Sequence, residues 1–131
     1  CEISSHIMVK EGIRIKGLRN KLITGLQCDI PNIIINGSME HRLDGNLNIC
    51  LPLKNSESII MSMREIALSN GSACTSKAIE PSHVLIALGL NKKQTISSIR
   101  FGIGRFNTES EIEYTINKIK NVLNKNQTIQ T

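Results

Sequence analysis

The chain has 131 residues, of which 40% are hydrophobic, and it carries a formal net charge of +5 at pH 7. This length predicts a single domain over residues 1–131, and the hydrophobic content excludes a disordered chain. No apolar run approaches the ~20 residues that a membrane span needs, and the N-terminus lacks the pattern of a signal peptide, so we expect a soluble, cytoplasmic protein.

The net charge arises from 16 Lys and Arg residues against 11 Asp and Glu residues. An excess of basic residues is typical of proteins that bind nucleic acids. Here the basic residues are scattered, and the side chains that could stack on a base are limited to Phe101, Phe106 and Tyr114. A solvated basic surface explains the pattern better, so we expect no nucleic-acid partner.

The four cysteines stand at positions 1, 28, 50 and 74. They form no CxxC pair, and no histidine stands at a ligand spacing from them, so we expect neither a zinc site nor, in a cytosolic protein, a disulfide. Cys28 and Cys50 lie in or beside apolar segments, where a cysteine usually acts as a small core residue. Cys74 instead stands in a run of small, mostly polar residues.

The first half of the chain predicts two helices with two strands between them. A helix is expected over about 7–26, ended by Pro31. Its apolar stripe, at helical spacing, consists of Ile15, Leu18, Leu22 and Leu26. Short apolar runs then predict strands at 33–35 and 47–53, and a serine N-cap predicts a helix over 56–67.

The second half begins with small polar residues at 69–76, which predict a loop. A short helix is expected over 81–88, and Gly89 stops it. Its expected inward residues are Val84, Leu85 and Leu88. Residues 99–103 predict a strand.

The last helix is expected to follow Thr108 and Glu111, which have the spacing of a capping box. Its apolar stripe consists of Ile112, Ile116, Ile119 and Leu123. The resulting order, α-β-β-α-loop-α-β-α, predicts an α+β fold in which helices cover one face of a small, mostly antiparallel sheet.

Cys74 lies in the most polar loop of the chain, flanked on both sides by small residues. Such a loop leaves a thiol exposed, and Lys77 could favour its thiolate form. These features are compatible with a nucleophile, although a cysteine in a loop is more often incidental.

Arg100 lies in a predicted strand between apolar neighbours, two residues before a glycine. A buried arginine is costly unless it meets an anion, and a carboxylate bound through two hydrogen bonds is the natural ligand. A structural ion pair is an equally good explanation, and its candidate partners are Glu57, Glu65 and Glu80. Arg105 is expected to reach solvent or to form a structural pair.

Several segments together resemble the cysteine desulfurases, in the branch of the iron–sulfur-assembly and nitrogen-fixation enzymes. Residues 69–76, Ser-Asn-Gly-Ser-Ala-Cys-Thr-Ser, resemble the loop that carries the family's active cysteine. The other matching segments, in the family's order, are 17–22, 80–90, 98–106 and 111–116. The resemblance covers about residues 10–124, and the coupled motifs make it far more specific than the loop alone.

The resemblance implies the small C-terminal domain of a fold-type I enzyme that depends on pyridoxal phosphate (PLP). In that family the large domain binds PLP through a lysine, and the homodimeric enzyme converts L-cysteine to alanine. By resemblance, Cys74 takes up the sulfur as a persulfide and Arg100 holds the substrate carboxylate. Sulfur-acceptor or iron–sulfur scaffold proteins are the implied partners, and no membrane is involved.

Two departures from the family pattern limit this expectation. Ser5 and His6 resemble the start of the family's Ser-His-Lys motif for PLP, but Ile7 follows them, and they lie too close to the first helix, so we interpret the likeness as a coincidence; we also expect the large domain to be absent from these residues. We therefore expect the isolated chain to bind no PLP productively and to be inactive. The longer C-terminal tail that docks the scaffold protein is also missing. The alternative is an inactive fragment that acts as a sulfur-carrier or interaction domain.

Overall fold

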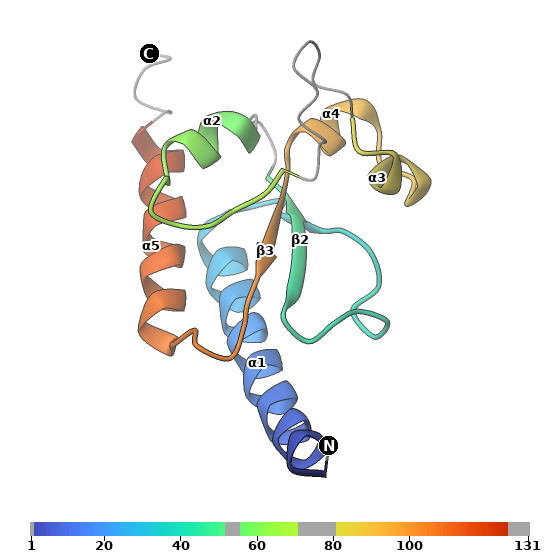
Figure 1. Ribbon diagram of the computed structural model, residues 1–131. Coiled ribbons are helices and arrows are strands. Elements are labelled where there is room, and N and C mark those ends of the chain that lie inside the picture. Colours follow the sequence, from blue (N-terminus) through green and yellow to red (C-terminus); the bar gives the residue numbers. More distant parts are fainter. Residues whose placement is uncertain (1, 52–55, 71–80, 126–131) are drawn as a thin grey trace.

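The computed structural model describes residues 2–51, 56–70 and 81–125, which form helices and an antiparallel sheet (Figure 1). In chain order these elements are α1 (Glu2–Asp29), β1 (Ile34–Ile35), β2 (Asn46–Cys50), α2 (Ser56–Met61), α3 (His83–Ala87), α4 (Lys92–Ile96), β3 (Ser98–Gly102) and α5 (Glu109–Lys125). This architecture confirms the α+β fold class expected from the sequence.

The three strands of the described residues form one antiparallel sheet in the order β1-β2-β3. The register places Ile49 opposite Ile99 and Asn48 opposite Arg100. Because successive side chains of a strand point to opposite faces, the sheet has one apolar and one polar face. The apolar face consists of Leu47, Ile49, Ile99 and Phe101, all of which are buried.

Helices α1 and α5 cover the apolar face and pack against each other (Figure 1). The predicted stripes of both helices enter the core: Leu18, Leu22 and Leu26 of α1 and Ile112 and Ile119 of α5 are buried. The N-terminal part of α1 extends beyond the sheet, and Met8, Val9 and Ile13 are largely exposed there.

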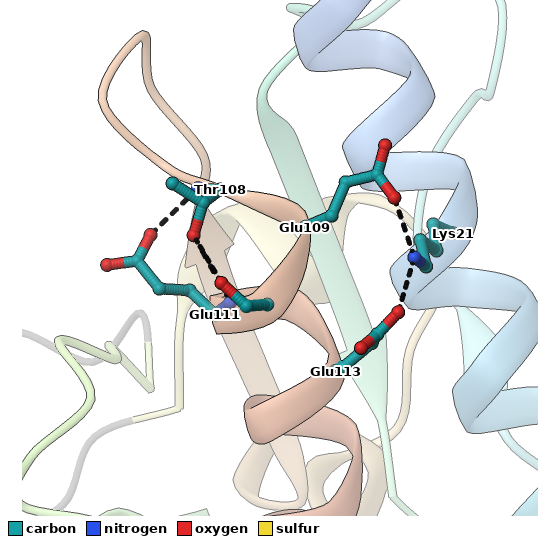
Figure 2. Close-up of polar contacts among 6 residues, drawn as sticks. Lys21, Thr108, Glu109, Glu111 and Glu113 are labelled. Atoms are coloured by element: carbon teal, nitrogen blue, oxygen red, sulfur yellow. Dashed lines mark hydrogen bonds and ion pairs between the residues drawn. The ribbon is translucent and has the colours of Figure 1, made fainter.

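Polar contacts hold the start of α5 beside α1 (Figure 2). The Nζ of Lys21 on α1 lies 2.9 Å from Glu109 Oε2 and 2.6 Å from Glu113 Oε1. The expected capping box is present: the Thr108 amide donates to Glu111 Oε2 (2.8 Å), and the Glu111 amide donates to Thr108 Oγ1 (3.3 Å). The capping contacts satisfy amides that have no partner within the helix, and so fix where α5 begins.

Two helices differ from the sequence expectation. α2 ends at Met61 instead of continuing through Ala67. The Ser62 hydroxyl donates to the Ser58 carbonyl (2.9 Å), a contact that competes with the regular helical ladder. α4 was not predicted, although Asn91 and Gln94 form a capping box that the sequence pattern contains.

Helix α3 differs from the expectation in the residues it buries. Leu85 is buried, but Val84 and Leu88 are 56% and 52% exposed, so their predicted inward orientation is wrong. The helix is too short to bury more than one side, and it lies toward the polar face of the sheet, not the face that α1 and α5 cover. Gly89, with φ +88°, ends it as predicted.

Within the described residues, the helices are all too short or too polar to cross a membrane.

Candidate functional site

Arg100 projects from the polar face of the sheet. Its neighbours Ile99 and Phe101 are buried on the other face, whereas the Arg100 side chain is exposed. The expected burial of this arginine is therefore wrong, because the strand alternation turns it away from the core. Its charge remains available, since no carboxylate of the described residues forms an ion pair with it.

Of the three carboxylates considered as structural partners of Arg100, Glu65 is engaged elsewhere and Glu80 lies outside the described residues. Glu65 accepts hydrogen bonds from Lys118 and from the Tyr114 hydroxyl, which lower its pKa to about 2. Glu80 belongs to the segment that the structure does not describe. This arrangement weakens the alternative of a structural ion pair for Arg100.

Cys74 lies outside the described residues, but the chain on both sides of its segment is described. Before it, Ser69 forms two backbone hydrogen bonds with Arg100: the Arg100 amide donates to the Ser69 carbonyl (2.6 Å), and the Ser69 amide donates to the Arg100 carbonyl (3.2 Å). After it, Ser82 lines the same cavity as Arg100. The described chain before the Cys74 segment therefore pairs with Arg100, and the described chain after it lines the same cavity as Arg100.

The cavity beside Arg100 has a volume of about 360 Å³. Its floor is the polar face of the sheet, with Asn46 and Asn48 of β2 next to Arg100. One wall consists of residues 36–42, and the opposite wall belongs to α3 and its flanks. The described lining residues include two arginines and one histidine but no carboxylate, so the cavity favours an anionic ligand.

Buried hydrogen bonds connect the strands beneath this cavity. The Asn36 amide group donates to Asn48 Oδ1 (2.7 Å) and to Ser98 Oγ (2.9 Å). The Ser98 hydroxyl in turn donates to the Gln94 carbonyl of α4 (2.7 Å). The network joins the residue after β1 to β2, β3 and α4, so it holds the strand that carries Arg100 in a defined position.

Arg42 is a cavity residue that the sequence reasoning missed. It donates from Nη2 to the Asn36 carbonyl (2.7 Å) and from Nε to the Ser38 carbonyl (2.5 Å). Burial lowers its pKa, and the nearby charge of Arg19 lowers it further. Only the fold places Arg42 and Arg100 around one cavity.

The remaining cysteines and Arg105 have structural surroundings. Cys50 is buried as expected, and burial raises the pKa of its thiol, an effect that a hydrogen bond with Ser98 partly opposes. Cys28 is exposed, so its assignment to the core is wrong; it stands two residues beyond the buried Leu26, on the outer side of α1. Arg105 Nε lies 3.1 Å from Glu11 Oε2. Arg105 therefore forms a structural ion pair, which was one of the two environments predicted for it.

The chain is similar to curated bacterial proteins named cysteine desulfurase IscS. It is 53% identical over 123 residues to that of Haemophilus influenzae (strain PittEE), and 54% identical over 123 residues to that of Pasteurella multocida (strain Pm70). Each match covers 94% of this chain but 30% of the relative. The chain therefore spans about a third of the length of these relatives. No protein-family model matches it.

The fold is also similar to a solved structure described as a NifS-like protein. The match has a TM-score of 0.78 at 24% sequence identity, and it covers 94% of this chain and 31% of the other. The helices and the three-stranded sheet thus recur as one region of a longer chain.

Proposed function

Since the chain is homologous to the IscS-type cysteine desulfurases over 94% of its residues, we propose that it is the C-terminal small domain of such an enzyme. The enzyme would remove sulfur from L-cysteine for iron–sulfur cluster or thio-cofactor assembly. The observation that carries the proposal is about 53% identity sustained over 123 residues. The anion-favouring cavity that Arg100 lines supports it independently.

Cys74 is the proposed sulfur acceptor. Its thiolate would attack the sulfur atom of L-cysteine, forming a sulfur–sulfur bond while the carbon–sulfur bond of the substrate breaks. Cysteine and the protein thiol then become alanine and a protein persulfide, so atoms and electrons balance. A thiolate is the reactive form, and the small polar residues that flank Cys74 in the sequence suit it better than the buried surroundings of Cys50.

Arg100 is the proposed ligand of the substrate carboxylate. Its side chain is exposed on the cavity side of β3, and no described carboxylate competes for it. A guanidinium can bind a carboxylate through two parallel hydrogen bonds. Two backbone hydrogen bonds join Arg100 to Ser69, which stands five residues before Cys74 in the sequence.

The described residues do not fit a complete site for PLP. Lysine, which the cofactor needs for its covalent link in this family, is missing among the described residues that line the cavity. We assign PLP binding to the part of a desulfurase that these 131 residues do not include. The proposed partners are that part of the enzyme, a second subunit and a sulfur-acceptor or scaffold protein.

A chimeric enzyme tests this proposal. The segment of the Haemophilus influenzae relative that this chain matches is replaced by residues 1–131, and the chimera is supplied with PLP and L-cysteine. We expect alanine to form and a persulfide to appear on the protein, detected by mass spectrometry of its peptides. Cys74→Ser should abolish persulfide formation, because the accepting sulfur is lost.

Cys28→Ser is the matched control, since Cys28 is an exposed cysteine on α1 that does not line the cavity. It should leave alanine and persulfide formation unchanged. A folded chimera that binds PLP but produces no alanine would contradict the proposal and favour a sulfur-carrier or interaction domain. A persulfide that persists in the Cys74→Ser variant would contradict the role of Cys74.

A further inference from the structure

Asn48 is the middle residue of a row that crosses the polar face of the sheet. On one side, its backbone carbonyl accepts a hydrogen bond from the backbone amide of Asn36 (2.9 Å), and on the other side it stands opposite Arg100 in the register of β2 and β3. All three residues line the cavity. Directly opposite residues on one face have Cβ atoms about 4.5–5.5 Å apart, so the side chains of Asn48 and Arg100 can reach one ligand.

A series of hydrogen bonds determines which end of the Asn48 side chain is free. The Gln94 carbonyl can only accept, so the Ser98 hydroxyl donates its proton there (2.7 Å). Toward Asn36 this hydroxyl can then only accept, and it does so from Asn36 Nδ2 (2.9 Å). The same nitrogen donates to Asn48 Oδ1 (2.7 Å). Asn48 therefore meets Asn36 with its oxygen, which turns its own Nδ2 away from Asn36.

Nδ2 of Asn48 is a donor that the described residues leave unused. No described residue accepts a hydrogen bond from it, and it is not one of the buried atoms that lack a partner, so it is accessible from the cavity side. Arg100 beside it forms no ion pair with a described carboxylate. Two adjacent donors, one of them charged, suit a carboxylate, because its two oxygens accept several hydrogen bonds.

We infer that Asn48 Nδ2 is a second donor to the substrate carboxylate, beside Arg100. The contacts of Asn36, Ser98 and Gln94 hold the amide in the orientation that donates, and an amide keeps this donor at every pH at which the protein is folded. The inference rests on the proposed function for the identity of the ligand, L-cysteine. The pair of donors itself does not depend on sulfur transfer.

Two substitutions of Asn48 in the chimeric enzyme test the inference. Asn48→Asp keeps an oxygen that accepts from Asn36, but it replaces the free donor by a negatively charged acceptor. KM for L-cysteine should rise more than about tenfold, with little change in kcat. Asn48→Ser removes the donor without adding a charge, and KM should rise about tenfold. A residue that served only the hydrogen-bond network would tolerate Asn48→Asp with an unchanged KM.

Asn117→Asp is the matched control. It makes the same chemical change at an exposed residue of α5, the helix that packs on the apolar face of the sheet, and it does not line the cavity. It should leave KM for L-cysteine unchanged. An active chimera whose KM is unchanged in either Asn48 variant, or rises as much in Asn117→Asp, would overturn the inference.

A titration of the 131-residue chain with acetate tests carboxylate binding without sulfur transfer. The side-chain amide resonances of Asn48 are followed by nuclear magnetic resonance while acetate replaces chloride at constant ionic strength. We expect saturable shifts of the Asn48 resonances, none for Asn117, and smaller shifts of Asn48 in Arg100→Ala. A chimera that makes no alanine would contradict the proposed function, and this titration then decides the inference alone. Unshifted Asn48 resonances, or shifts that are the same without Arg100, would in that case overturn it.

Discussion

Replacing Arg100 by alanine should weaken substrate binding while leaving the fold intact. The side chain is exposed and pairs with no described carboxylate, and its contacts with Ser69 and β2 are made by the backbone. The free energy of unfolding should therefore change by less than about 0.5 kcal/mol. A hydrogen bond to a charged group contributes about 1.5–3 kcal/mol, so KM for L-cysteine should rise roughly ten- to a hundredfold.

The assay is alanine formation by the chimeric enzyme over a range of L-cysteine concentrations. Since the carboxylate is held both before and during sulfur transfer, KM should rise with little change in kcat. Arg100→Lys should recover only part of the loss, because lysine lacks the planar guanidinium. Arg105→Ala is the control, and it should leave KM unchanged. An unchanged KM in Arg100→Ala, or an equal rise in Arg105→Ala, would refute the assigned role.

Three further predictions concern stability and isolated activity. Leu26→Ala, in the core, should lower the free energy of unfolding by about 2–5 kcal/mol in urea denaturation, whereas Leu43→Ala, at a largely exposed side chain, should change it by less than about 0.5 kcal/mol. The hydrogen bond from Lys118 lowers the pKa of Glu65 from its usual 4.5 to about 2, so it stabilises the fold above pH 4.5, and this contribution is lost as the pH falls toward 2. In Glu65→Gln, the melting temperature should accordingly depend less on pH between about 2 and 4.5 than in the wild type. An unchanged pH dependence of the melting temperature would show that the Glu65–Lys118 pair does not cause it. Residues 1–131 alone, mixed with PLP and L-cysteine, should form no alanine above background in an amino-acid assay; clear turnover would show that the cofactor lysine is not needed.

The elements that the sequence predicted well are those with a local cause. The stripes of α1 and α5 follow from the helical period, and the start of α5 follows from the capping box of Thr108 and Glu111. Helix α4 was equally predictable from Asn91 and Gln94, and it was missed because its apolar pattern is short. The end of α2 at Met61 was harder to predict. The hydrogen bond from the Ser62 hydroxyl to the Ser58 carbonyl destabilises a helix only slightly, and serines also occur inside helices, so the sequence carries no strong stop signal there.

The candidate site was predicted in part. Arg100 was recognised from its strand and from the family resemblance, but its exposure was not foreseen, because a strand pattern does not reveal which face other elements cover. Arg42 and Asn36 gave no signal of their own in the sequence. The fold makes them site residues. Arg42 donates to the Asn36 carbonyl across the turn at Gly37, and the Asn36 side chain donates to Asn48 on the neighbouring strand β2.

The sequence by itself determined the α+β class, the helical stripes, the caps and the similarity to cysteine desulfurases, because these depend on local periodicity and on motif order. Only the tertiary structure decided that Arg19 is buried, that Ser69 pairs with Arg100, and that Arg42 lines the same cavity as Arg100. These pairs are far apart in the chain. Their proximity results from sheet register and from the packing of the helices and connecting segments around the sheet, which no local pattern encodes.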